Sequence, residues 1–174
     1  MGDTATNSSI CEYRRAVGKP IACEERGIMR VLIAVDDSAF SASVLRAVET
    51  GVRHENTEVL VLHVLQPVEP VAPPEMARDY APELEDEQQP ARALVERMAG
   101  QLRRTGFKTQ VDVRIGDVTE TILNRAAEWR ADLIAVGSHG QRSLQDFFLG
   151  SVAESVARRA GCSVVIIRTP ATSK

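Results

Sequence analysis

The sequence has few cysteines, and they are not spaced as metal ligands or as a disulfide framework. Cys11, Cys23 and Cys162 are odd in number, form no C-x-x-C pair and have no nearby pair of histidines to complete a zinc site. Unpaired thiols of this kind are typical of proteins kept in a reducing compartment. We therefore expect reduced cysteines and a cytoplasmic location.

Long hydrophobic runs and an excess of basic charge are also missing. No stretch approaches the roughly 20 consecutive apolar residues that cross a bilayer, and the first residues lack the apolar segment of a secretory signal. The formal net charge is -3 at pH 7, so no global field attracts the chain to nucleic acid. We expect neither a membrane nor a nucleic-acid partner, and any bound anion must be held by local groups.

Apolar runs rich in β-branched residues alternate with helical patterns along the chain. The third run alternates apolar and polar residues as an edge strand does, whereas the others are typical of strands buried on both faces. The alternation predicts an α/β fold with a doubly wound, five-stranded parallel sheet flanked by helices. The five runs lie at 29–35, 58–64, 109–115, 132–137 and 163–168.

Local signals predict where the helices begin and end. Ser38 precedes the first helical pattern, and Asp117 or Thr119 precedes the third. The second pattern covers 90–106, where Gly106 is predicted to end the helix in a left-handed conformation.

Two segments depart from the repeating pattern. Residues 1–28 read as a flexible N-terminal extension of the domain at 29–170. Residues 66–90 carry six of the eight prolines and seven acidic residues against a single arginine, which predicts an extended, solvated loop. Because this insert follows the carboxyl end of the second strand, it borders the place where open α/β sheets bind ligands.

Three glycines and a serine follow the fourth strand at that same edge. Gly137 and Gly140 form a G-x-x-G turn, and Gly150 and Ser151 open the last helix. Such a turn lets backbone N–H groups approach an anion, and a helix N-terminus favours phosphate. Arg142 is close enough in the sequence to contact a bound anion with its guanidinium group. The alternative is a plain strand end followed by an ordinary helix start, and the spacing alone leaves both readings open.

Residues at the ends of the first two strands are further candidates. The phosphate-binding patterns G-x-x-x-x-G-K-[ST] and G-x-G-x-x-G are absent, so a nucleotide would be held differently. Asp36 can accept a hydrogen bond from a ribose or position a metal, or it can belong to the loop and cap of the next helix. Backbone groups at His63 and Val64 can pair with an adenine edge, whereas the His63 side chain is more typical of a satisfied core residue.

The pattern G-x2-G-x9-G-[ST] in this strand context resembles the ATP-binding branch of the universal stress protein family. Supporting segments are VLIAVDDS, VLVLHV, RIGDVTETIL, ADLIAVGSHG and SVVIIR, and the similarity covers roughly residues 29–169. The resemblance implies an adenine nucleotide alpha hydrolase-like fold with strand order 3-2-1-4-5. It also implies a homodimer formed through the last strand, 163–168, which would cover an exposed sheet edge.

The resemblance further implies ATP as the ligand, with Mg²⁺. Asp36 is expected to contact the adenosine part and Val64 to meet adenine through its backbone. The glycines and the start of the last helix are expected to surround the ribose and phosphates. The candidate binding residues are Ala34, Asp36, Val64, Val136, Gly137, His139, Gly140, Arg142, Gly150, Ser151 and Val152.

Three functions remain open from the sequence. The first is an adenine nucleotide-binding regulatory protein of the stress response, whose nucleotide-dependent state a partner reads. The second is a slow ATPase or autokinase, for which Asp36, His139 and Arg142 supply some groups but no P-loop lysine or second acidic metal motif is present. The third is a nucleotide-free dimeric scaffold, which the three glycines disfavour.

Overall fold

The computed structural model describes residues 27–67, 81–138 and 149–168 of the chain. Within them, neighbouring strands are parallel and the sheet has the order β3-β2-β1-β4-β5. This arrangement confirms the expected doubly wound, five-stranded sheet. The strands are β1 (Met29–Val35), β2 (Thr57–Leu65), β3 (Lys108–Ile115), β4 (Leu133–Gly137) and β5 (Ser163–Ile167).

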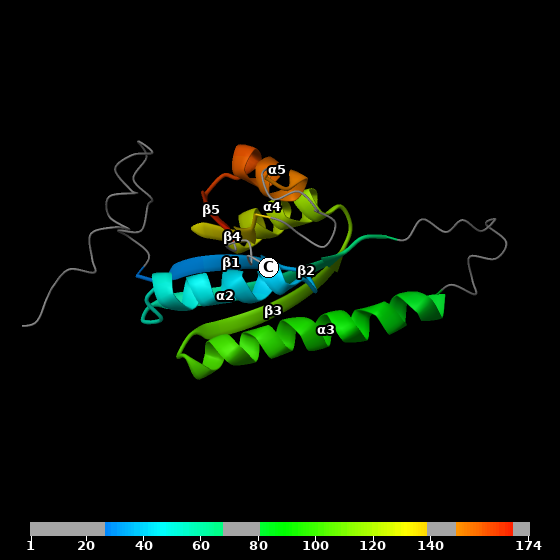
Figure 1. Ribbon diagram of the computed structural model, residues 1–174, viewed down its shortest axis with the longest axis horizontal. Coiled ribbons are helices and arrows are strands. Elements are labelled where there is room, and N and C mark those ends of the chain that lie inside the picture. The colour runs from blue at the N-terminus through cyan, green and yellow to red at the C-terminus, as the bar shows by residue number, and fades with distance from the viewer. Residues whose placement is uncertain (1–26, 68–80, 139–148, 169–174) are drawn as a thin grey trace, which may run out of the picture.

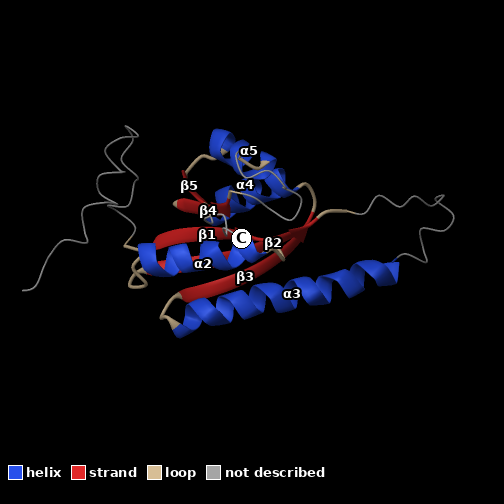
Figure 2. Ribbon diagram, in the orientation of Figure 1, coloured by secondary structure: helices blue, strands red, loops and turns tan. Residues whose placement is uncertain are grey.

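Helices connect the strands and cover both faces of the sheet. They are α2 (Ala39–Gly51), α3 (Ala81–Arg104), α4 (Val118–Trp129) and α5 (Ser151–Arg159). Helices α2 and α3 lie on one face, and α4 and α5 lie on the other (Figures 1 and 2). In the described part of the chain, no helix is both long enough and apolar enough to cross a membrane.

Alternate residues of the strands build two separate cores. In β1, Val31 and Ile33 pack with α2 and α3, whereas Leu32 packs with α4 and α5. All three side chains are 0% exposed, so this strand is buried on both faces. Double burial explains why the central strands appear in the sequence as continuous apolar runs.

The outer strand β3 confirms the prediction of an edge strand. Its Val111 and Val113 pack against the core under α3, while Asp112 and Arg114 lie on the α4 side. The Asp112 carboxylate accepts hydrogen bonds from Arg125 Nε at 2.7 Å and from Arg114 Nε at 3.0 Å. Polar side chains therefore cover this edge of the sheet on the α4 side.

Helix α3 corrects the expectation for the proline-rich insert. The sequence predicts an extended loop as far as residue 90, and this is wrong for residues 81–90, because α3 begins at Ala81 and contains Pro90 in its interior. Proline usually breaks a helix because it lacks an N–H group. For this reason the sequence predicts that the helix starts at Pro90. The intervening glutamates and glutamines favour helix, and that propensity prevails here. Residues 68–80 of the insert and 1–26 of the extension lie outside the described residues.

The ends of the helices partly follow the predicted signals. Asp117 caps α4, since its Oδ1 accepts a hydrogen bond from the Glu120 N–H at 2.9 Å. Gly106 has φ 96°, which confirms the left-handed turn after α3. Ser38 occupies the N-cap position of α2, but its side chain makes no capping bond to that helix. It bonds to Asp36 instead.

Candidate functional site

The candidate site lies at the carboxyl ends of β1 and β4. These strands are neighbours in the sheet, yet β1 leads into α2 on one face and β4 leads towards α5 on the other (Figure 1). Open α/β sheets bind ligands where the connections diverge in this way. The strand order therefore places the ends of β1 and β4 where such sheets bind ligands.

Asp36 is held rigidly in the turn between β1 and α2. Its Oδ1 accepts hydrogen bonds from the Ser38 N–H at 3.2 Å, from the Ser38 hydroxyl, and from the Ser41 hydroxyl at 2.8 Å. The Ser41 oxygen in turn accepts a hydrogen bond from the Asp36 N–H at 2.8 Å. Oδ1 therefore belongs to the loop before α2, and contact of Asp36 with a ligand stays a prediction.

Ser41 is a residue of this site that the sequence prediction missed. Ser41 lies in the first turn of α2 and is only 3% exposed. A buried hydroxyl needs a partner, and Asp36 supplies both a donor and an acceptor. The signal was a serine five residues after the strand-ending aspartate, at a position that faces the sheet.

His63 and Val64 differ in which of their groups are already engaged within the sheet. His63 Nδ1 lies 2.8 Å from the Val35 carbonyl oxygen, which can only accept, so Nδ1 carries the proton. His63 is thus a satisfied residue, as expected. The β1–β2 pairing ends at Val35 and His63, whereas β2 pairs with β3 as far as Leu65. From Val64 onwards, β2 no longer pairs with β1. The backbone groups that point towards β1 there are suited to a contact with a ligand.

The remaining described candidates in β1 and β4 have small or buried side chains, so any contact they make with a ligand would be through the main chain. Val136 is 3% exposed and packs in the core under α4 and α5, so only its backbone can face a ligand. Ala34 packs partly against the same core. Gly137, the last residue of β4, is half-buried and lies opposite Ile167 of β5.

A backbone hydrogen bond joins the end of β4 to the start of α5. The Gly150 N–H donates to the Ser138 carbonyl oxygen at 2.8 Å, and the Ser138 N–H donates to the Ile167 carbonyl oxygen at 2.8 Å. The two halves of the glycine pattern are therefore brought together in the described residues. Gly150 has φ −61° and ψ 146°, a conformation open to any residue. Its backbone angles thus do not explain why glycine stands there.

The beginning of α5 presents donors beside this junction. Ser151 is exposed and Val152 is half-buried against the core. The first N–H groups of a helix have no acceptor within the helix, and the helix dipole favours negative charge there. The predicted binding residues His139, Gly140 and Arg142 lie outside the described residues.

Metal ligands are not clustered in the part of the chain that the structure describes. There, no group of three or more His, Cys, Asp or Glu side chains is placed to hold a metal ion. Cys162 is an unbridged thiol, whose pKa is raised by burial and, secondarily, by the charge of Asp132. Cys11 and Cys23 lie outside the described residues.

An ion pair fixes α5 against its neighbour α4. Arg159 donates to both carboxylate oxygens of Glu120, with distances of 2.6 Å and 2.8 Å. The hydrogen bond from Arg159 lowers the pKa of Glu120, and the same bond raises the pKa of Arg159. The pair stands at the end of α5 opposite the candidate site, so it orients that helix without entering the site.

Comparison with known proteins identifies the family. The model of the universal stress protein family matches residues 27–168. The chain belongs to the universal stress protein family. Universal stress protein Sll1388 of Synechocystis sp. is 28% identical over 153 residues, which are 82% of this chain and 99% of that protein.

Solved structures of universal stress proteins share the fold, which is adenine nucleotide alpha hydrolase-like. MJ0577 of Methanocaldococcus jannaschii has a TM-score of 0.72 and 26% identity, covering 82% of this chain and 97% of that chain. A universal stress protein family protein of Arabidopsis thaliana with AMP bound has a TM-score of 0.57 and 22% identity, covering 82% of this chain and 93% of that chain. An Archaeoglobus fulgidus universal stress protein in complex with dAMP has a TM-score of 0.56 and 23% identity, covering 80% of this chain and 97% of that chain.

Proposed function

We propose that this universal stress protein binds an adenine nucleotide at the carboxyl ends of β1 and β4. The observation that carries the proposal is the Gly150 N–H···Ser138 hydrogen bond of 2.8 Å, which sets the start of α5 beside the end of β4. A phosphate held there would meet the N–H groups of Ser151 and Val152, which have no acceptor within α5. The backbone of Gly150, with φ −61°, would accept any residue. A bound ligand that leaves no room for a side chain would explain why glycine stands there.

Relatives support the chemical class of this ligand. The Arabidopsis thaliana protein has AMP bound, and the Archaeoglobus fulgidus protein is in complex with dAMP. Both ligands combine adenine, a pentose and phosphate. In the present chain, Val64 would meet the adenine, Asp36 would contact the ribose, and the β4–α5 connection would hold the phosphate.

Within this class we propose ATP, accompanied by Mg²⁺. The sequence of the β4–α5 connection adds Gly140, His139 and Arg142 to the described donors, which suits a ligand with several phosphates. Mg²⁺ usually keeps several waters and binds one or two carboxylates together with substrate phosphates. Because the phosphates themselves would supply oxygen ligands, no preformed metal cluster in the described residues is needed.

The biological role that fits best is a regulatory one, through a cytoplasmic homodimer. In the described sheet β5 pairs with β4 alone, and its Val165 is 38% exposed. An exposed edge of this kind is commonly covered by a second copy. We propose that nucleotide occupancy changes the β4–α5 connection next to this edge, and that a stress-response partner recognises the altered dimer.

Titration calorimetry with ATP, ADP, AMP and adenosine tests the proposed ligand. We expect Gly150→Ala to weaken the binding of the preferred nucleotide at least about tenfold, which corresponds to about 1.4 kcal/mol. The matched control is Gly161→Ala, because a Cβ at Gly161 meets nothing within 4 Å. It should bind as the wild type does. Equal affinities for all three proteins, or no binding of any adenine compound, would refute the proposal.

A further inference from the structure

We propose that His63 is a positioning residue of the nucleotide site. Its side chain fixes the place of Asp36 and, through Asp36, the preference for a sugar that carries free hydroxyl groups. His63 itself does not touch the ligand. This role presupposes the nucleotide site proposed above, in which Asp36 contacts the ribose.

The first observation is a hydrogen bond that joins the ends of β1 and β2. His63 Nδ1 lies 2.8 Å from the carbonyl oxygen of Val35. Val35 and His63 are also the last residues that these two strands pair in register. The ends of a ladder open more easily than its middle, so a side-chain bond at this point holds the two strand ends together.

The second observation is that the same carbonyl belongs to the peptide unit that carries Asp36. The Val35 carbonyl and the Asp36 N–H lie in one plane, because the peptide bond between them does not rotate freely. The Asp36 N–H donates to the Ser41 hydroxyl oxygen at 2.8 Å. The peptide unit is therefore held from both sides, by His63 of β2 and by Ser41 of α2.

These bonds determine the direction in which the Asp36 side chain leaves the backbone. Its Oδ1 is held further by the Ser38 N–H and by the Ser41 hydroxyl. A carboxylate that is fixed before the ligand arrives loses little conformational freedom on binding. Its direction then decides which sugar hydroxyl groups it can reach.

The position of His63 also links the two expected contacts with the nucleoside. Val64 follows His63 directly, and its backbone is expected to meet the adenine, whereas Asp36 is expected to meet the ribose. The bond between His63 and Val35 therefore sets the spacing between these two contacts.

The surroundings of the bond make it more than a surface contact. Val35 is 6% exposed and Ser41 is 3% exposed, while His63 is half-buried. Hydrogen bonds of buried groups are costly to remove, so we expect the turn after β1 to shift when His63 loses its donor. The alternative is that His63 only stabilises the sheet, and its loss would then affect every ligand alike.

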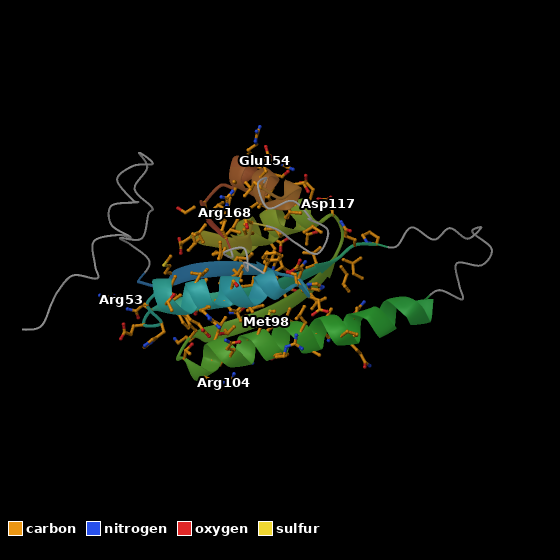
Figure 3. The ribbon with its side chains drawn as sticks, viewed as in Figure 1. Arg53, Met98, Arg104, Asp117, Glu154 and Arg168 are labelled. Atoms are coloured by element: carbon orange, nitrogen blue, oxygen red, sulfur yellow. The ribbon has the colours of Figure 1, made fainter. Side chains whose placement is uncertain are left out.

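Two replacements of nearly the same shape test the role. His63→Leu removes the donor, whereas His63→Asn can place an amide N–H where Nδ1 stood, because both nitrogens are attached to Cγ. The matched control is His54→Leu, since His54 is exposed and lies in the loop before β2. Figure 3 shows Arg53, which precedes His54, at the end of the molecule opposite Asp117, which comes just after the carboxyl end of β3.

Titration calorimetry in the presence of Mg²⁺ compares ATP with dideoxyadenosine triphosphate, which lacks both ribose hydroxyl groups. We expect the wild type to prefer ATP at least about tenfold, as for hydrogen bonds to a charged group. His63→Leu should reduce this preference at least about threefold and change the affinity for the dideoxy compound less than about twofold. His63→Asn should restore the preference, and His54→Leu should leave both affinities unchanged.

An Asp36→Ala background shows whether His63 acts through Asp36. There, His63→Leu should alter ATP binding less than about twofold, because the effects of residues in one network are not additive. A preference that survives in His63→Leu, or an equal loss for both compounds, would overturn the proposal and leave nucleotide binding standing. A wild type that binds both compounds equally would also overturn it. A wild type that binds no adenine compound would refute the nucleotide site, and this role with it.

Nitrogen NMR shifts of the His63 ring in the ligand-free protein test the premise without a nucleotide. We expect the proton on Nδ1, since the Val35 carbonyl oxygen can only accept. Circular dichroism confirms that each variant is folded. A ring protonated on Nε2 alone would lack the donor towards Val35 and would overturn the proposal.

Discussion

Asp36 and Ser41 show how single residues shape the candidate site. The sequence predicted Asp36 from its place after β1, but it left open whether the carboxylate binds a ligand or caps the turn. The structure shows that Oδ1 belongs to the turn through three hydrogen bonds. Ser41 was missed because serine is mostly exposed in proteins, so its residue type outweighed its inward-facing position in the helix.

Replacing Ser41 by alanine tests this local network. The change removes the acceptor of the Asp36 N–H and one donor to Oδ1, so we expect a loss of about 1–2 kcal/mol in the free energy of unfolding. Urea denaturation measures it. Thr50→Ala is the control, since the exposed Thr50 hydroxyl bonds only to carbonyls of its own helix. A Ser41→Ala protein no less stable than the control would contradict the network.

At the scale of elements, the sequence predicted the strands well because burial on both faces leaves an unmistakable apolar run. β1 was predicted with its observed bounds, and β5 differs by one residue. Helix α3 begins nine residues before the predicted start at Pro90, because the prolines and the acidic residues of the insert both favoured a loop there. The β4–α5 junction was predicted as a unit, although its hydrogen bond to Ser138 has no signature in sequence.

The α4–α5 ion pair gives a pH-dependent prediction. Arg159 lowers the pKa of Glu120 below its ordinary value of 4.5 and itself stays charged. The pair therefore contributes its full stability above pH 4.5, and this contribution is lost as the pH falls through the lowered pKa of Glu120. The effect is small because both side chains are half-exposed.

Urea midpoints of the wild type and Glu120→Gln measure this dependence. The variant should be slightly less stable at about pH 7, and the difference should shrink as the pH falls below 4.5 and through the lowered pKa of Glu120. Glu55→Gln is the control, because Glu55 is exposed and forms no ion pair within the described residues. A difference that persists unchanged at acid pH would show that the pair does not titrate as described.

At the scale of the whole molecule, the fold separates the candidate ligand site from an open edge of the sheet. The candidate ligand site lies at the carboxyl ends of β1 and β4, and β5 forms one edge of the described sheet. The two can be altered separately, because Gly150 precedes α5 whereas Val165 lies within β5. Ligand binding and the proposed assembly through β5 are therefore separable by experiment.

A crystal structure of the protein grown with an excess of adenine nucleotide and Mg²⁺ tests the central claim most directly. We predict that a phosphate oxygen accepts hydrogen bonds from the N–H groups of Ser151 and Val152, and that the adenine lies beside the backbone of Val64. A nucleotide bound on another surface, or an empty site at the ends of β1 and β4 under these conditions, would contradict the account.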